Sequence, residues 1–183
     1  MNLINLITGK KINLLKNLES ISNCQISNFK NYNFFVFWDN DDLTSNEKNI
    51  VKKKFKNSYF LTVDSNIYKK KFYNLIKDKH FHLNLRKIIS DSYFQYSILQ
   101  LAFIYASKIL KKKSLQISHG QRIRSDIFVE RKIKYNPVND LLLPCSINGY
   151  GICDFHCIGP HKTFKIYCDL IHTITDLFKL NIF

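Results

Sequence analysis

The stretch that most constrains the fold is FFVFW, residues 34–38. Five large apolar residues in a row fit a strand that is covered on both faces, as at the centre of a sheet flanked by helices. The acids that follow this strand are Asp39, Asp41 and Asp42. Carboxylates at a strand end can hold Mg²⁺ or act in acid–base chemistry. However, Thr44 and Glu47 have the spacing of a helix-capping box, so we interpret the acids as turn and cap residues.

Short apolar segments alternate with amphipathic ones along the first two-thirds of the chain. Strands are predicted at residues 34–38, 59–63, 81–89 and 114–119. Helices are predicted at residues 10–20, from 44 or 45 onward, from 65 or 66 to 76, and at 93–112. This order predicts the α/β class, as a small alternating sandwich with a mixed or antiparallel four-stranded sheet.

The last third of the chain has a different pattern. Residues 164–183 have helical spacing, with an apolar stripe that could bind a partner: Phe164, Tyr167, Ile171, Ile174 and Phe178. We therefore expect an α/β RNA-binding domain over residues 1–143. A linker containing Cys and His residues and a C-terminal helical extension would occupy residues 144–183.

The charge balance points to a polyanionic partner. The net charge is +14 and the pI is about 9.6, which suits RNA or an anionic membrane surface, while the 45% apolar fraction excludes a fully disordered chain. No apolar run has the length of a membrane span, and no secretory signal is apparent. The five cysteines are therefore expected to be free thiols in a reducing compartment. Glycine-rich nucleotide loops and Walker motifs are absent from the sequence.

Basic residues gather in short runs near helix ends, with aromatic residues close by. A solvated surface would explain them, but their arrangement also fits a phosphate-binding face. The residues expected to bind RNA are Lys10, Lys11, Lys52, Lys53, Lys54, Asn66, Lys69, Lys70, Lys71, Arg122 and Arg124.

Two alternative sites come from residue types that suit metal chemistry. A zinc site could use Cys145, Cys153, Cys157 and His161, although their spacing does not form two short ligand pairs. A metal-dependent nuclease could use Asp126, Glu130 and Lys132, although Glu-x-Lys is frequent in a lysine-rich chain. The simpler interpretation is that the first set consists of buried thiols and the second of solvated charges. We therefore expect no metal or other cofactor.

Residues 42–72, DLTSNEKNIVKKKFKNSYFLTVDSNIYKKKF, resemble the stalk-base protein family of the large ribosomal subunit, called L-ten in bacteria and P-zero in the eukaryotic cytosol. Leu43-Thr44 matches the family's "LT" at a helix start, and residues 63–67, VDSNI, match its "VKNTL" turn. The family glycine before "LT" is Asp42 here. A looser resemblance to the C-terminal domain of the small-subunit protein S-three rests on Ser118, Gly120 and Arg122.

The resemblance implies a non-catalytic ribosomal protein that binds ribosomal RNA at the base of the large-subunit stalk. Its implied partners are ribosomal RNA, neighbouring ribosomal proteins and an acidic stalk-protein dimer, with no membrane. The bias toward Asn, Lys, Ile, Phe and Tyr is what AT-rich codons give, so we expect a mitochondrial ribosome in the matrix, with an organelle-encoded chain. Another AT-rich organelle or an endosymbiont would give the same bias.

Overall fold

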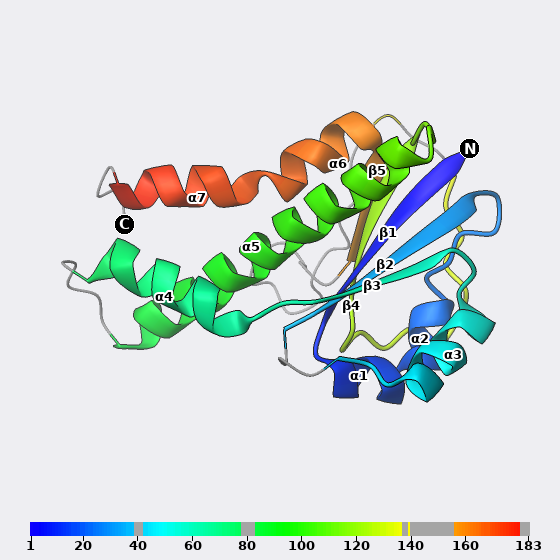
Figure 1. Cartoon of the computed structure of the whole chain (residues 1–183). Helices are drawn as coiled ribbons and strands as arrows, with labels where there is room; N and C mark the ends of the chain where they lie inside the picture. Colours follow the sequence, from blue (N-terminus) through cyan, green and yellow to red (C-terminus); the bar gives the residue numbers. More distant parts are fainter. Residues whose placement is uncertain (39–41, 78–82, 137–138, 140–155, 180–183) are drawn as a thin grey trace.

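The protein is a mixed α/β structure built on one five-stranded sheet, with helices on both faces (Figure 1). The computed structural model describes residues 1–38, 42–77, 83–136, 139 and 156–179. The strands are β1 (Asn2–Gly9), β2 (Lys30–Phe37), β3 (Ser58–Thr62), β4 (His119–Arg124) and β5 (His156–Pro160). Their order across the sheet is β3-β2-β1-β4-β5; β1 to β4 are parallel, and β5 is antiparallel to β4.

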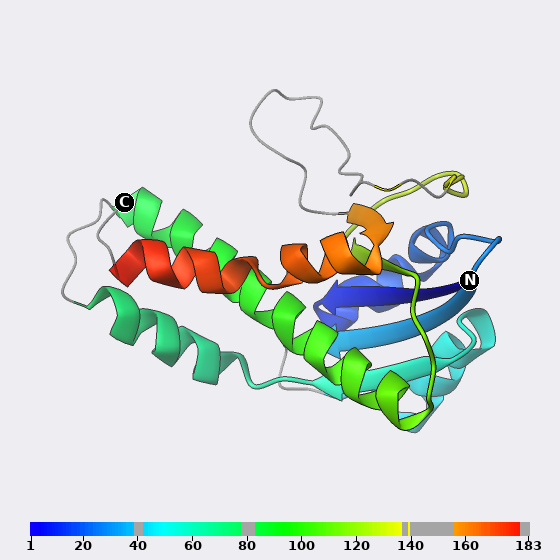
Figure 2. The same cartoon turned by 90° about the horizontal axis from the view of Figure 1, so that it is seen from above.

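The helices form two layers, and figures 1 and 2 show which face each layer covers. The layer on one side consists of α1 (Lys11–Lys16), α2 (Leu18–Ser22) and α3 (Ser45–Lys54). The other side carries α4 (Ser65–Ile76), α5 (Leu83–Lys112), α6 (His161–Cys168) and α7 (Leu170–Lys179). Alternate residues of each strand point to opposite layers, so both faces of the central strands must be apolar. This requirement explains the FFVFW run in β2.

The core on the α5–α6 face is rich in aromatic residues. Phe34 stacks on Tyr59 of β3 with a ring separation of 4.7 Å, and α5 contributes Ile98 and Ala102 to the same cluster. Phe164 of α6 lies so close to Gly120 of β4 that a Cβ there would be 1.9 Å from the Phe164 ring. A side chain at position 120 would therefore displace α6 from the sheet.

The opposite face has a smaller apolar core beside a row of buried amides. Leu14, Ile21 and Val51 bring α1, α2 and α3 onto the sheet. The side chains of Asn33, Asn5 and Gln121 lie next to one another in register across β2, β1 and β4, and each is fully buried. Asn5 donates to the Asn33 side chain over 2.8 Å, which satisfies part of this buried polar layer.

Several predicted elements are confirmed. The strands at 34–38 and 59–63 correspond to β2 and β3, and the helix from 65 or 66 to 76 is α4. The capping box is present: Thr44 Oγ1 accepts from the Glu47 N–H, and Glu47 accepts from the Thr44 N–H. Asp42 accepts from the Leu43 N–H and pairs with Lys48, as a turn residue would. Asp39 and Asp41 lie outside the described residues.

Other predicted elements are wrong. The sheet has five strands rather than four, because β1 and β5 are additional and the strand predicted at 81–89 does not belong to it. The strand predicted at 81–89 is helical from residue 83 onward, as the start of α5, and the strand predicted at 114–119 begins only at His119. The single helices at 10–20 and 164–183 are each divided in two.

The predicted domain boundary at residue 143 lies outside the described residues; beyond it, β5 and α6 complete the same sheet and core.

Candidate functional site

The strand order identifies the edge of the sheet where a ligand site is expected. From β1 the chain places β2 and β3 on one side and β4 on the other, so the order reverses beside β1. In open parallel sheets, ligands bind outside the carboxyl ends of the strands at such a reversal. The carboxyl ends of β1, β2 and β3 lead into α1, into the segment before α3, and into α4 (Figure 1).

A cleft with a volume of about 550 Å³ lies at this edge. The ends of β1 and β2 supply part of the lining, and helices α4 and α5 supply the rest. The lining residues are Lys10, Trp38, Ser65, Lys69, Asp91, Phe94 and Gln95. The cleft therefore combines two large aromatic residues with cations, a carboxylate and an amide.

The aromatic wall is formed by residues distant in sequence. Trp38, at the end of β2, meets Phe94 of α5 edge to face, with ring centroids 5.3 Å apart. Tyr68 of α4 approaches Phe94 in the same manner at 6.3 Å. These contacts hold each ring by its neighbours, and Trp38 remains half-buried beside the cleft. Trp38 is the single tryptophan of the chain.

The polar lining of the cleft comes from the end of a strand and from a helix. Lys10 directly follows β1, and Lys69 lies in the second turn of α4; both are exposed. Asp64 caps α4 by accepting the Asn66 N–H over 2.8 Å. The amino terminus of α4, which carries the positive end of the helix dipole, thus lies beside the lysines. The cleft is consequently electropositive along one side.

Behind the cleft, Gln95 links it to two arginines of β4. Its Oε1 accepts from Arg122 Nη2 at 3.3 Å and from Arg124 Nη1 at 3.2 Å. Arg124 in turn grips Asp126 with two hydrogen bonds of 3.0 and 2.7 Å. Burial raises the pKa of Asp126, but the hydrogen bonds and charge of Arg124 outweigh burial, so the pKa is below its usual value. Asp126 is therefore ionised at neutral pH.

Arg122 is almost completely buried, with 1% of its surface exposed. Its Nη1 donates to the Tyr167 hydroxyl over 2.7 Å, and its guanidinium lies 5.6 Å from the centre of the Tyr96 ring. Burial raises the pKa of Tyr167, although the charge of Arg122 opposes the rise. Arg122 thus links α5, α6 and β4 in the interior of the protein, and it does not lie on the surface.

The ends of β1 and β4 come very close at this edge. Gly9 has a φ of +154°, and a Cβ on it would be 1.8 Å from Ser125 Oγ. The Ser125 N–H donates to the Thr8 carbonyl over 2.9 Å. A glycine is required at position 9 by both its backbone conformation and this close approach. Gly9 therefore lets β1 and β4 end side by side, so that Lys10, after β1, and Asp126, after β4, begin at the same edge of the sheet.

The residues predicted to bind RNA are divided among several places. Lys10 and Lys69 lie in the cleft, whereas Lys11 points to the Asp42 carbonyl. Five of the predicted residues are exposed on α3 and α4, outside the cleft: Lys52, Lys53, Asn66, Lys70 and Lys71. Lys54 pairs with Glu19, and Arg122 is buried, so Arg122 does not lie where it could contact RNA. Arg124 is half-buried against Asp126.

The alternative sites are not assembled within the described residues. Asp126 is held by Arg124, while Glu130 and Lys132 are exposed in an irregular segment after β4. Cys145 and Cys153 lie outside the described residues. Cys157 is fully buried, and burial raises the pKa of its thiol to about 12, whereas His161 lies at the start of α6. Among the described residues, no group of three or more metal-ligating side chains is found.

The apolar stripe predicted for partner binding is largely used within the chain. Phe164 and Tyr167 belong to the main core, and Ile171 packs with α4 and α5. Ile174 is half-buried beside Ile171. Phe178 lies in α7, and its side chain is outside the described part of the structure. The prediction that these residues face a partner is therefore wrong for the three that are buried.

The sequence reasoning missed the residues that bring the cleft together. The sequence pattern places Trp38 at the end of an apolar strand and Phe94 and Gln95 within the helix predicted at 93–112, with no local link between them. The available signal was positional: Trp38 and Lys10 both directly follow buried strands. This signal becomes usable only when residues 2–9 are recognised as a parallel strand beside β2.

None of the described helices has the length and apolar character needed to cross a membrane.

Comparison with known proteins identifies no family for this chain. No family model matches the chain, and no curated protein matches it. A solved structure with partial likeness is the crystal structure of mouse xyloside xylosyltransferase 1 in its apo form, with 9% identity and a TM-score of 0.32. The match covers 80% of this chain and 46% of that protein, so the chain spans about half of its length. A likeness this weak indicates neither the fold nor the function.

Proposed function

We propose that the cleft at the carboxyl edge of the sheet binds a nucleoside phosphate. The observation that carries this proposal is the cleft itself. It places a half-buried tryptophan and a phenylalanine beside two exposed lysines, at the strand-order reversal of a parallel sheet. A ligand that satisfies both features has a flat aromatic part and a polyanionic part.

The aromatic wall suits a nucleobase. Bases stack on aromatic side chains with about 1–3 kcal/mol per base, largely independent of base identity. Trp38 offers the largest ring of the cleft, and Phe94 fixes its orientation by their edge-to-face contact. Gln95 and Ser65, on α5 and α4, add polar groups that can hydrogen-bond to a base or a ribose.

The phosphates would be held by side chains rather than by a glycine-rich loop. The sequence has no Walker motif and no dinucleotide fingerprint. Lys10 and Lys69 lie on the walls of the cleft, and the capped start of α4 adds its dipole. Lysines bind phosphate as point charges, so this arrangement tolerates different phosphate positions.

The absent loops also bear on the reaction. Hydride transfer from a dinucleotide and phosphoryl transfer from a P-loop use glycine-rich loops that this chain lacks. We infer that the nucleotide serves as the leaving group of an activated donor, because the cleft places a carboxylate, Asp91, together with the two lysines. In that reaction the transferred group passes to an acceptor hydroxyl, and its bonding electrons stay on the departing phosphate oxygen. The hydroxyl proton passes to a carboxylate, for which Asp91, the acid that lines the cleft, is the candidate.

The fluorescence of Trp38 tests the proposal directly, because no other tryptophan contributes to the signal. Titration with ADP, UDP and GDP in the presence of Mg²⁺ should quench the emission saturably with at least one of them. Lys69→Gln should weaken that binding by about tenfold, the loss of one charge-assisted contact. Lys70→Gln is the matched control, since Lys70 is the next residue of α4, is exposed, and does not line the cleft.

Two results would reject the nucleotide proposal. One is emission that stays unchanged with all three nucleotides at millimolar concentration. The other is an equal loss of affinity in Lys69→Gln and Lys70→Gln, which would reduce the effect to overall charge.

The second candidate is the ribosomal function that the sequence resemblance implies, in which the chain binds ribosomal RNA without catalysis. The exposed lysines of α3 and α4, together with the net charge of +14, favour it. Co-sedimentation with mitochondrial large ribosomal subunits in low salt tests it. Lys52→Gln/Lys53→Gln should release the chain from the particle at lower salt than the wild type. Absence from the particle in low salt would reject this candidate and leave the nucleotide proposal untouched.

A further inference from the structure

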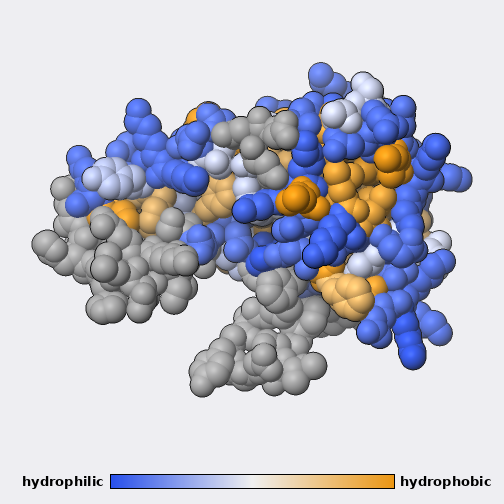
Figure 3. Space-filling model, turned by 90° about the horizontal axis from the view of Figure 1, so that it is seen from below, coloured by the Kyte–Doolittle hydropathy of each residue, from blue (hydrophilic) through white to orange (hydrophobic). Residues whose placement is uncertain are grey.

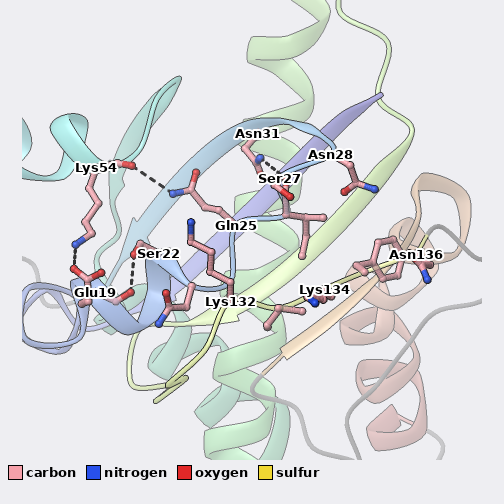
Figure 4. Close-up of a pocket in the computed structure, with 14 residues that line it drawn as sticks. Glu19, Ser22, Gln25, Ser27, Asn28, Asn31, Lys54, Lys132, Lys134 and Asn136 are labelled. Carbon is pink, nitrogen blue, oxygen red and sulfur yellow. Dashed lines mark hydrogen bonds and ion pairs between the residues drawn. The ribbon is translucent and has the colours of Figure 1, made fainter.

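A second hollow lies at the opposite, amino end of β2. It has a volume of about 830 Å³ and is bounded by α2, the start of β2, and the segment that follows β4 (Figure 4). Most of its lining residues are polar or charged, and Ile26, Ile133 and Tyr135 contribute apolar surface beside them. The side chains that define it are Gln25, Asn28, Asn31, Lys132, Lys134 and Asn136.

The segment after β4 is held beside α2 by side chains at every third position. Asn17 donates to the Ser125 carbonyl at 3.1 Å, Ser20 to the Ile127 carbonyl at 3.1 Å, and Asn23 to the Val129 carbonyl at 2.8 Å. The hydrogen-bonded carbonyls belong to alternate residues, as expected of an extended chain lying along one helical face. This attachment fixes the wall of the hollow to which Lys132 and Lys134 belong.

The amide wall is equally well fixed. Asn31 donates to the carbonyls of Ile26 and Phe29, both at 2.9 Å, and accepts from the buried Asn5 at 2.9 Å. Gln25 donates to the Lys54 carbonyl at 3.4 Å, and Lys54 pairs with Glu19 (Figure 4). These bonds use both N–H groups of Asn31, so Asn31 holds the wall in place before a ligand arrives, and the exposed amides of Asn28 and Asn136 are the ones that face the ligand.

The charge of the hollow comes from two lysines. Lys132 and Lys134 are exposed, and within the described residues neither has an ion-pair partner. Lys132 extends across the hollow toward Gln25 (Figure 4). Because the carboxylate of Glu19 is paired with Lys54, the hollow keeps a positive charge.

The lining also excludes ligands that bind mainly by stacking. Among the described lining residues the one aromatic ring is that of Tyr135, which is 6% exposed and packs against Phe29 and His119. Single-stranded nucleic acids rely on open aromatic faces. Carboxamides instead donate and accept at one planar group, which matches the vicinal hydroxyls of a sugar.

We propose that this hollow binds an acidic carbohydrate, with its hydroxyls on the amide wall and its anionic group between Lys132 and Lys134. The site is separate from the nucleotide cleft, since the two lie at opposite ends of β2, and the inference does not depend on the proposed function.

Calorimetric titration of the intact chain tests the proposal with three probes: a galacturonic acid tetramer, an uncharged galactose tetramer and hexauridylate. The acidic tetramer should bind, and the uncharged one should bind at least about tenfold more weakly, because it lacks the charge-assisted contacts. Lys132→Gln/Lys134→Gln should reduce binding of the acidic tetramer by about tenfold or more. Asn28→Ala should weaken binding of both sugars, because Asn28 is an exposed lining residue.

Lys52→Gln/Lys53→Gln is the matched control, because it removes the same charge from α3 outside the hollow. This variant should bind the acidic tetramer as the wild type does. An equal loss in the two double variants would overturn the proposal, as would no binding of the acidic tetramer to the wild type. Tighter binding of hexauridylate that is lost in Lys132→Gln/Lys134→Gln would also overturn it, since the hollow would then be an RNA site.

Discussion

The two faces of the sheet bury polar groups of different character. On the face covered by α5 and α6, the buried group is a cation, Arg122, which donates to the Tyr167 hydroxyl and to Gln95. On the face covered by α1 to α3, the buried groups are uncharged amides, with His156 beside them. The first face can hold its polar group only with hydrogen-bond acceptors around it, because arginine carries N–H donors alone and does not lose its charge. The second face depends on a histidine that must stay neutral.

Burial keeps His156 neutral, and the hydrogen bonds of Gln121 fix which ring nitrogen of His156 carries the proton. Gln121 Nε2 donates to the Cys24 carbonyl over 3.0 Å, which orients the amide. The same nitrogen lies 2.6 Å from His156 Nε2, so this ring nitrogen must accept and cannot carry a proton. Burial lowers the pKa of His156 to about 4. The comparison shows that one sheet can tolerate a fixed charge on one face while the other face is sensitive to acid.

The outer surface of the α1–α3 layer is also distinctive (Figure 3). Hydrophilic residues surround a band of hydrophobic ones over these helices. Ile12 of α1 and Ile50 of α3 are 69% and 45% exposed, respectively, and Phe128, after β4, is 75% exposed. The outer surface of this layer therefore combines an exposed apolar band with the polar residues that surround it.

The largest effect is expected from removing the buried cation. Arg122→Ala should lower the free energy of unfolding by about 4 kcal/mol, because it leaves a cavity and deprives Tyr167 and Gln95 of a donor. Denaturant titration measures this loss. Arg122→Met keeps most of the volume without a buried charge and should lose clearly less. A loss below about 1 kcal/mol in Arg122→Ala would show that the cation is not part of the core.

Acid should act next, and through the other face. His156 has a pKa of about 4 when folded, against an ordinary value of 6.5, so the unfolded chain binds its proton more readily. The resulting stability is present above pH 6.5 and is lost as the pH falls toward 4, up to about 3 kcal/mol. Burial also lowers the pKa values of His119 and His161, which act in the same direction.

A variant isolates the contribution of His156. The free energy of unfolding of His156→Gln, followed from pH 7 to pH 4, should fall less steeply than that of the wild type. His172→Asn changes an exposed histidine and should keep the wild-type slope. Parallel pH profiles for the wild type and His156→Gln would contradict a neutral, buried imidazole.

A smaller effect should follow from removing the Tyr167 hydroxyl, which accepts a hydrogen bond from Arg122. Tyr167→Phe removes one acceptor from the buried guanidinium and should cost about 1–2 kcal/mol in the free energy of unfolding. Tyr73→Phe, at a position 62% exposed, should change it by less than about 0.5 kcal/mol. If both substitutions were equally mild, Gln95 and the ring contacts would be enough to hold the cation on the α5–α6 face.

The smallest effect should come from an exposed contact over the acid-sensitive face. Thr44→Ala removes the side-chain half of the capping box and should cost about 1 kcal/mol, measured by thermal unfolding. Asn46→Ala, an exposed neighbour in the first turn of α3, should have almost no effect. A loss from Thr44→Ala as large as that from Arg122→Ala would contradict the distinction between buried and exposed polar contacts.

The part of the fold that could be predicted lies in the segment from β2 to α4. The FFVFW run, the Thr44–Glu47 box and the helix start at Ser65 or Asn66 are local signals, and each marks the element found there. The strand β1 was missed because Asn5 interrupts its apolar run. This residue is fully buried, and its partners are Asn31 and Asn33 of the neighbouring strand. No local pattern distinguishes such an asparagine from one in a loop.

The candidate site could be predicted only in part. Lys10 and Lys69 were expected to meet phosphate, and both line the cleft, whereas Arg122 had the same composition signal and is buried. The difference arises because Arg122 lies inside a strand that has a neighbour on each side. Its side chain points to the face where Tyr167 and Gln95 accept its hydrogen bonds. A single sequence does not show which face of a strand a side chain will meet until its neighbours are known.

The sequence by itself determined the α/β class, the excess of positive charge and the position of the capped helix α3. These properties depend on residue type and on spacing within one turn or one strand. The tertiary structure alone decided the parallel order of β3-β2-β1-β4, the antiparallel addition of β5, and which lysines line a cleft. Strand pairing joins residues that are far apart along the chain, such as Leu6 with Arg122, so the energies that select it are absent from any local stretch.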